Sequence, residues 1–305
     1  IEKDYCLAKR KEKEDGSFIY ENTAAKLFMS NMDDCIIVRG DMHTALSNAN
    51  NCSFLAGTVK LAGNIKLWDY TYLDLKKDIT LILNGDKQQQ FTFDYNRLNI
   101  GSLVIENEKG LFVTSENQVN VKGNLSTNGY PVKGWFNILN GAMIKDDIFQ
   151  GNLIFTDNYS MSKDLYVEGE VNLYRLNLNG YHLTVDGNCT LNYNNRGMID
   201  QKNGILEIKG DVLYSGGYCS YQGSGTNQVI LSGNKKQTIQ ANDLKWNFQE
   251  LIIENTSEEG VYAAGLFDAH KIIDPDHKLS FYTEGDIGYT LTKDTVIQGD
   301  FNLLT

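Results

Sequence analysis

Two pairs of adjacent carboxylates are the positions where this sequence could support acid–base chemistry. Hydrolysis of a glycosidic bond requires two carboxyl groups about 5 to 9.5 Å apart, and Asp33-Asp34 and Asp146-Asp147 are the adjacent aspartate pairs. Neither pair has a His, Arg or Lys partner motif nearby in the sequence, although partners could come from segments stacked in space. The sequence therefore favours a protein without catalytic activity, with a polysaccharide-active enzyme as the alternative.

A metal site is the second chemistry to consider, because histidine is the commonest metal-binding side chain and Ca²⁺ takes clustered carboxylates. One cluster qualifies, but its spacing matches no defined motif, and Pro275 marks a loop, where Asp and His are common anyway. The glycine-rich calcium-binding nonapeptide, the P-loop, the dinucleotide fingerprint and a Ser/His/Asp arrangement are all absent from the sequence. We therefore predict no metal and no cofactor. The cluster contains Asp268, His270, Asp274, Asp276 and His277.

Two aromatic groups are candidates for stacking against a glycan. Trp68, Tyr70 and Tyr72 alternate along the chain, so in a strand their rings share one face. An exposed face would offer flat apolar area to a sugar, whereas a buried face would make the rings part of the core. The same two interpretations apply to a second group around Gly216 and Gly217, and a structural role is favoured for both. The second group contains Tyr214, Tyr218 and Tyr221.

Arg39-Gly40-Asp41 spells the tripeptide that integrins recognise on exposed loops. In this chain it occupies a position that recurs as apolar-x-Gly-Asp/Asn/Glu, and the residue before Gly varies freely. We therefore interpret Arg39 as an arbitrary side chain at a turn.

Composition and charge narrow the choice of partners. The 305 residues carry a formal net charge of −11, which repels a phosphate backbone. No stretch reaches the roughly 18 to 20 apolar residues that span a bilayer, so we expect neither nucleic acid binding nor membrane insertion. The chain starts with Ile, and we expect a processed chain or a fragment of a longer protein. The five cysteines include no CxxC pair, and Cys189 is expected to be a small buried hydrophobe.

A short repeat carries most of the information. Its glycines are 23 and 22 residues apart in Gly40, Gly63 and Gly85, and 23 apart in Gly187, Gly210 and Gly233. Such a period predicts one turn of a solenoid whose parallel strands stack about 4.8 Å apart. We expect each Gly to supply a positive φ at a corner and the following polar side chain to bond the local backbone. The nine copies contain Gly40, Gly63, Gly85, Gly123, Gly169, Gly187, Gly210, Gly233 and Gly299.

The short repeats are themselves grouped in a larger duplication. Gly40, Gly63 and Gly85 match Gly187, Gly210 and Gly233 at offsets of 147, 147 and 148. The segments 103–107 and 251–255 agree at the same offset of 148. We predict a charged cap or linker over residues 1–28, a first superunit over 29–125, a less regular join over 126–179 and a second superunit over 180–305. The charged stretch from Glu2 to Glu14 is the best candidate for a helix.

These patterns together predict an all-β fold, a single-stranded parallel β-helix (β-solenoid) with about 22–23 residues per turn and a short N-terminal cap. Val38 and Ile208 are expected to face its interior, because apolar residues alternate with polar ones around them.

The sequence also resembles a family, the Gly-Asp/Gly-Asn β-solenoid repeats of very large secreted or cell-wall proteins of anaerobic Gram-positive, clostridial-type bacteria. The resemblance covers roughly residues 29–301 and rests on segments 32–41, 55–64, 229–239 and 251–255 taken as a set. It implies an extracellular or cell-surface location in a multi-domain polypeptide and brings no catalytic residues.

The expectation from the sequence is therefore a non-catalytic structural or adhesive segment of an extracellular or cell-surface protein. Its expected partners are a glycan, a host or cell-surface protein, or a second copy of the chain. The alternative is a carbohydrate-binding or carbohydrate-active parallel β-helix module.

Overall fold

The computed structural model is all-β, and no helix occurs among the residues that the structure describes. Those residues are 5–6, 9–12, 18–21, 27–44, 52–67, 73–93, 98–114, 118–156, 159–174, 176–192, 203–215, 228–240, 246–264, 267–282, 296–298 and 302–304. The chain forms two compact units, Ile1–Asp146 and Asp147–Thr305. Their boundary falls inside the segment 126–179.

Three parallel sheets form most of the first unit, and four of its described turns contribute one strand to each sheet in chain order. The first sheet contains β5 (Cys35–Val38), β8 (Ala56–Leu61), β11 (Asp78–Leu83), β14 (Ser102–Ile105), β17 (Asn124–Ser126) and β20 (Met143–Ile144). The second contains β1 (Tyr5–Cys6), β6 (Met42–Thr44), β9 (Ile65–Leu67), β12 (Gln89–Thr92), β15 (Leu111–Val113) and β18 (Val132–Lys133). The third contains β10 (Leu73–Asp74), β13 (Leu98–Ile100), β16 (Gln118–Val121) and β19 (Trp135–Ile138).

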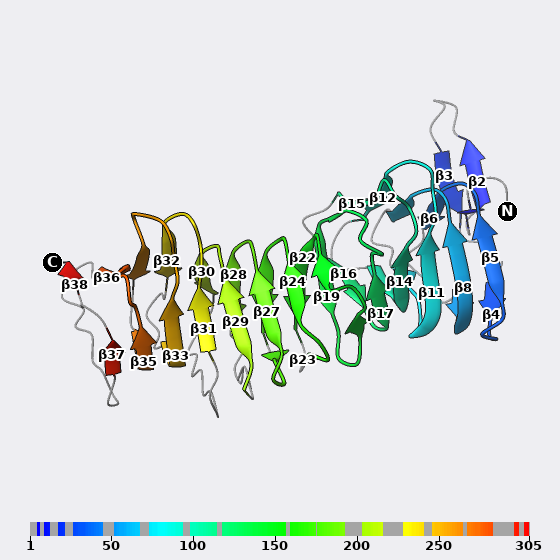
Figure 1. Cartoon of the computed structure of the whole chain (residues 1–305). Helices are drawn as coiled ribbons and strands as arrows, with labels where there is room; N and C mark the ends of the chain where they lie inside the picture. Colours follow the sequence, from blue (N-terminus) through cyan, green and yellow to red (C-terminus); the bar gives the residue numbers. More distant parts are fainter. Residues whose placement is uncertain are drawn as a thin grey trace. The chain divides into compact units, whose positions relative to one another are not determined.

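Two long parallel sheets form the second unit, and among the described residues a short third sheet accompanies its first turns. One sheet contains β21 (Ile148–Phe149), β24 (Leu165–Val167), β27 (His182–Val185), β29 (Ile205–Ile208), β31 (Gln228–Leu231), β33 (Trp246–Ile253), β35 (Phe267–Ile273) and β37 (Val296–Gln298). The other contains β22 (Asn152–Phe155), β25 (Val171–Leu173), β28 (Cys189–Asn192), β30 (Val212–Ser215), β32 (Gln237–Gln240), β34 (Val261–Ala264), β36 (Leu279–Tyr282) and β38 (Asn302–Leu304). The short sheet pairs β23 (Tyr159–Ser160) with β26 (Leu176–Asn177). Figure 1 shows β24, β27, β29, β31 and β33 lying side by side in chain order.

The predicted parallel β-solenoid is thus confirmed, and most turns have the predicted length. Ala56 pairs with Asp78 and His182 with Ile205, which are 22 and 23 positions apart. Leu165, however, pairs with Leu183, only 18 positions on. The shortening lies in the connection from the second sheet back to the first, residues 174–181, so the stacked strands keep their register.

The core consists of columns of apolar side chains that repeat from turn to turn. In the second unit, Phe149, Val167, Val185, Ile208, Leu231 and Ile253 occupy one column, and each is at most 2% exposed. Val38 occupies the corresponding column of the first unit and is fully buried. Val38 and Ile208 therefore face the interior, as predicted. Burial of each such side chain stabilises the folded state by about 1.5 to 3 kcal/mol.

The expected helix between Glu2 and Glu14 is wrong where the structure describes this stretch. β1 adds to the edge of a sheet beside β6, and β2 (Lys9–Glu12) pairs antiparallel with β3 (Phe18–Glu21). β4 (Leu27–Met29) pairs in parallel with β7 (Cys52–Phe54). The edge of a sheet offers hydrogen-bond partners to the backbone N–H and C=O groups of a segment that is distant in sequence. These inter-strand hydrogen bonds outweigh the weak helix propensity of this stretch.

Candidate functional site

The repeat glycines lie at corners where one turn closely approaches the next, and their role differs from the one predicted. None of the repeat glycines from Gly40 to Gly233 has a positive φ. A Cβ at Gly63 would lie 2.3 Å from the carbonyl oxygen of Gly40, and one at Gly210 would lie 2.4 Å from that of Gly187. The corner therefore requires glycine because the neighbouring backbone leaves no room for a side chain. Gly299 lies outside the described residues.

At several corners, the polar residue after the glycine bonds the next turn rather than its own turn. Asn188 Oδ1 accepts a hydrogen bond from the backbone N–H of Asp211, 23 residues on, at 2.9 Å. Asp211 Oδ1 accepts in turn from the N–H of Thr238 at 2.7 Å. In the first unit, Asp41 Oδ1 accepts from the N–H of Asn64 at 2.8 Å. The predicted local bond is thus wrong, because the stacked turn presents its N–H groups at this corner.

Asp41 of the Arg-Gly-Asp tripeptide belongs to this set of corner contacts. Its other carboxylate oxygen lies 2.8 Å from Lys66 Nζ. Partial burial acts to raise the pKa of Asp41, but the hydrogen bonds from Lys66 and Asn64 and the charge of Lys66 hold it below the usual value. The carboxylate therefore links adjacent turns.

A buried glutamine replaces the direct contact between glycines in two of the corners. Gly210 N–H donates directly to Gly187 O at 3.2 Å. At the next corner, Gly233 N–H donates to Gln237 Oε1 at 2.8 Å, and Gln237 Nε2 donates to Gly210 O at 2.8 Å. Asn255 Nδ2 also donates to Gln237 Oε1 at 2.8 Å. The side-chain amide is therefore inserted between two turns.

The duplicated superunit contains the same arrangement 148 residues earlier. Gln89 Oε1 accepts from the N–H of Gly85 at 2.9 Å, and its Nε2 donates to Gly63 O at 2.5 Å. Asn107 Nδ2 contacts Gln89 Oε1 at 3.1 Å. Both glutamines are 1% exposed, and the two asparagines are 1% and 2% exposed. The offset seen in the sequence thus corresponds to equal structural roles.

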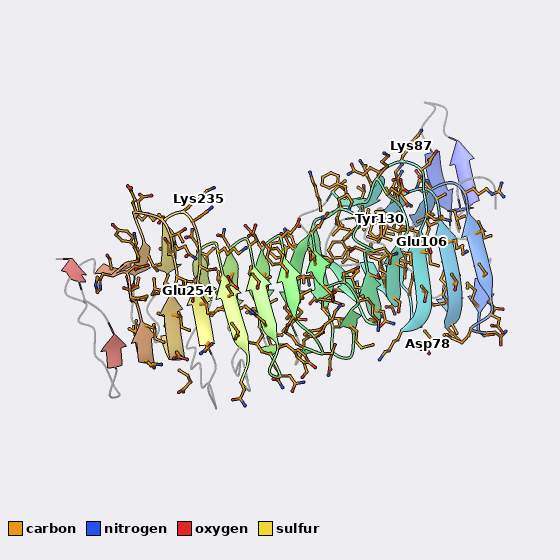
Figure 2. All side chains as sticks on the ribbon, in the orientation of Figure 1. Asp78, Lys87, Glu106, Tyr130, Lys235 and Glu254 are labelled. Carbon is orange, nitrogen blue, oxygen red and sulfur yellow. The ribbon has the colours of Figure 1, made fainter. Side chains whose placement is uncertain are left out.

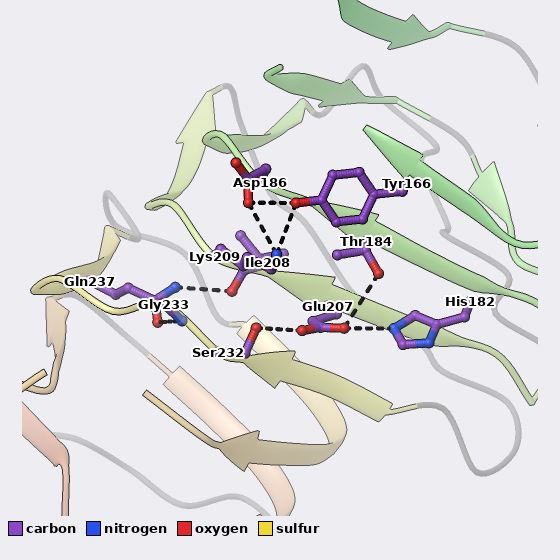
Figure 3. Close-up of polar contacts among 10 residues, drawn as sticks. All are labelled: Tyr166, His182, Thr184, Asp186, Glu207, Ile208, Lys209, Ser232, Gly233 and Gln237. Carbon is purple, nitrogen blue, oxygen red and sulfur yellow. Dashed lines mark hydrogen bonds and ion pairs between the residues drawn. The ribbon is translucent and has the colours of Figure 1, made fainter. Parts of the chain in front are cut away.

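A charged cluster covers the outer side of the second unit's first sheet (Figure 3). Lys209 Nζ donates to Tyr166 Oη at 2.9 Å, and Tyr166 Oη donates to Asp186 Oδ1 at 2.8 Å. Lys209 Nζ also lies 3.1 Å from Asp186 Oδ1. The bond from Tyr166, opposed by partial burial and aided by Lys209, lowers the pKa of Asp186. The cluster ties three successive turns together.

Glu207, beside this cluster, joins a histidine and a serine without forming a catalytic triad (Figure 3). Ser232 Oγ donates to Glu207 Oε1 at 2.5 Å, and His182 Nε2 lies 3.0 Å from Glu207 Oε2. A triad requires the histidine to contact the nucleophile. Here the strand of Glu207 separates the other two, which puts their strands about 9 to 10 Å apart. His182 therefore cannot accept the serine proton.

Three of the four aspartates in the predicted carboxylate pairs have structural partners. Asp34 Oδ2 accepts from the N–H groups of Ser30 and Asn31, both at 3.0 Å, and these bonds lower its pKa, led by the bond from Asn31. Asp146 Oδ2 accepts from the N–H of Thr127 at 2.7 Å. Asp147 Oδ1 lies 2.6 Å from Lys163 Nζ. These contacts hold the three carboxylates in place in their turns.

Asp274, the buried member of the predicted metal cluster, caps a turn. Its two carboxylate oxygens accept from the N–H groups of Lys278 and Leu279, each at 2.8 Å. The described residues contain no group of three or more His, Cys, Asp or Glu side chains placed to hold a metal ion. The side chains of Asp268 and His270 lie outside the description.

The aromatic candidates fall outside the part of the chain whose side chains the structure describes. Trp68, Tyr70, Tyr72, Tyr218 and Tyr221 lie outside the described residues, as does the side chain of Tyr214, whose backbone belongs to β30. They remain predictions from the sequence.

Cys189 agrees with its predicted role. Its side chain is fully buried, and burial raises its pKa to about 12. The thiol packs as a small apolar group in the column that Val171 and Val212 continue on either side.

Sequence reasoning missed one repeat and the roles of the amides. Gln150-Gly151-Asn152 continues the corner pattern 18 residues before Gly169, and Asn152 Oδ1 accepts from the N–H of Glu170 at 2.8 Å. Gly169 and Gly187 have the same spacing of 18, which departs from the period of 22–23. Gln89 and Gln237 were visible only as matching letters at the offset of 148.

No family model matches this sequence, and no curated protein or solved structure is significantly similar to it. Among the described residues there is no helix that is long and hydrophobic enough to traverse a bilayer.

Proposed function

We propose that this chain is a non-catalytic structural or adhesive β-solenoid segment of an extracellular or cell-surface protein. The observation that carries the proposal is the use of polar side chains at the corners. Asp41, Asn188 and Asp211 accept hydrogen bonds from the following turn. Side chains committed to neighbouring turns stiffen a stack of strands and are not available for reaction.

The arrangement around Glu207 also supports a role without catalysis. Its carboxylate accepts from Ser232 and Thr184 and lies beside His182, so the two hydroxyl groups bond the carboxylate and not a substrate. His182, which would have to take the proton of a serine nucleophile in a triad, contacts Glu207 and is separated from Ser232 by the strand of Glu207.

The resemblance to Gly-Asp/Gly-Asn repeats supports the extracellular or cell-wall location and a bacterial source. The same resemblance, with the repeated lateral faces, supports contact with a glycan, with a host or cell-surface protein, or with a second copy of the chain. The carbohydrate-active alternative depends on the aromatic groups around Trp68 and Tyr218.

Location can be tested with antibodies raised against the chain and applied to intact and permeabilised cells that produce it. Staining of intact cells is expected. Staining that requires permeabilisation would contradict the location.

Catalysis can be tested by incubating the purified chain with a panel of polysaccharides and measuring new reducing ends. We expect none. Release of sugar that disappears in a Glu207→Gln variant would show that the outer face is an active site and would overturn the proposal.

A further inference from the structure

A polar depression of about 600 Å³ lies at the corners of four successive turns in the second unit. Every lining residue is a glycine or carries a polar side chain. Figure 3 shows Asp186, Lys209 and Ser232 at the ends of adjacent strands, and Lys235, labelled in Figure 2, belongs to the last of these turns. The volume falls within the range of about 300 to 1,000 Å³ that is typical of ligand sites.

The charges of the lining residues cancel. Three carboxylates and three ammonium groups contribute, namely Glu170, Asp186, Asp211, Lys209, Lys235 and Lys236. Asp186 and Lys209 neutralise each other at 3.1 Å. The depression therefore favours neither a polyanion nor a polycation, and the net charge of the chain, −11, further disfavours a polyanion.

The depression offers donors and acceptors in rows along the stack. Val185, Ile208 and Leu231 pair across adjacent strands. The residues that follow them therefore recur at the spacing of the turns, about 4.8 Å, and these are Asp186, Lys209 and Ser232. Lysine only donates, carboxylates only accept and asparagine does both. Hydroxyl groups, which both donate and accept, complement such a mixed surface, whereas an apolar ligand would lose hydrogen bonds of the lining to water.

We infer that this depression binds a neutral oligosaccharide that lies along the stack of turns. Successive sugar rings contact successive turns, with hydroxyl groups accepting from the lysines and from Asn234 and donating to the carboxylates. This ligand is additional to the structural role proposed above, and the inference can fail without that role failing.

The first unit supplies a matched control. The residues in the positions of Asp186 and Lys209 are Arg39 and Ala62, because Val38 and Leu61 pair as Val185 and Ile208 do. The corner of Arg39 and Ala62 therefore lacks the pair that Asp186 and Lys209 form. The following turn is nevertheless similar, since the backbone oxygens of Lys87 and Lys235 accept from Asn107 and Asn255 respectively.

The test is a glycan array of neutral and acidic oligosaccharides, followed by titration calorimetry of each binding glycan with three proteins. These are the unaltered chain, the double variant Asn234→Ala/Lys235→Ala, and the control Asp86→Ala/Lys87→Ala. All four side chains are exposed and take no part in the contacts between turns described above. We expect neutral glycans to bind, about ten-fold more weakly to the first double variant and unchanged to the control, because hydrogen bonds to a charged group are lost only in the former.

Three results would overturn the inference. These are the absence of any bound neutral glycan, binding restricted to acidic glycans, and equal affinity of the two double variants. Circular dichroism of both variants confirms that they are folded. An equal loss of affinity would place the glycan elsewhere on the chain.

Discussion

Replacing Gln237 by Leu removes the amide that is inserted between two turns of the second unit. Two of its four partners keep other hydrogen bonds. Ile208 O still accepts from Ser232 N–H at 3.1 Å, and Asn255 Nδ2 still donates to Lys235 O at 2.8 Å. Gly233 N–H and Gly210 O are the groups that lose the amide.

The expected cost follows from these two orphaned groups. Each buried, unsatisfied backbone group costs about 1 to 3 kcal/mol. The apolar Leu side chain offsets part of this by burying additional carbon, at about 0.8 kcal/mol per CH₂. We therefore expect the free energy of unfolding to fall by about 2 to 4 kcal/mol. Gln89→Leu should cost a similar amount, because Gln89 contacts Gly85 and Gly63 in the same way.

The assay is urea denaturation followed by circular dichroism, combined with amide hydrogen exchange at Gly233. Gln240→Leu is the control, since Gln240 is exposed on the same strand and its replacement should change stability by no more than about 0.5 kcal/mol. A loss below about 0.5 kcal/mol in Gln237→Leu, with Gly233 still protected, would refute the reasoning. It would mean that the corner closes to a direct Gly233–Gly210 bond.

Three further predictions concern sterics, pH and thiols. Gly210→Ala should lower the melting temperature far more than Gly129→Ala. A Cβ at position 210 would clash with backbone 2.4 Å away, whereas a Cβ at position 129 has open space and costs only the strain of a left-handed backbone, about 1 to 2 kcal/mol. Bonds from Lys271 and Gln228 outweigh partial burial and hold the pKa of Glu250 below its ordinary 4.5, so stability present above pH 4.5 should be lost as the pH falls through the lower folded value. Glu250→Gln should flatten this dependence in acid titration, and an unchanged slope would contradict it. Iodoacetamide should label exposed Cys35 in the native protein and buried Cys189 only after unfolding, as mapped by mass spectrometry.

The interior of the solenoid could be predicted from the sequence because it depends on local pattern. Alternation of apolar and polar residues around Val38 and Ile208 assigns one face of each strand to the core, and the period of the glycines assigns one turn to each repeat. The offset of 148 residues likewise predicted that two stretches would have equal roles, and Gln89 and Gln237 do.

The roles of the corner residues were decided by tertiary structure. Glycine can be required at position 63 either for a positive φ or because a side chain would clash with the neighbouring turn. The close approach of the Gly40 backbone decides for the clash, and the pattern of residues along the chain does not show that distance. The same holds for Asn188, whose partner N–H lies 23 residues away and comes within reach only when the turns stack.

The candidate site shows the same division. Composition and repeats determined a parallel β-solenoid without a recognisable catalytic motif, because periodicity is a property of neighbouring residues along the chain. Only the stacking of turns brought Glu170, Asp186, Lys209 and Lys235 to one depression, since hydrogen bonds between backbones fix which residues of distant turns become neighbours.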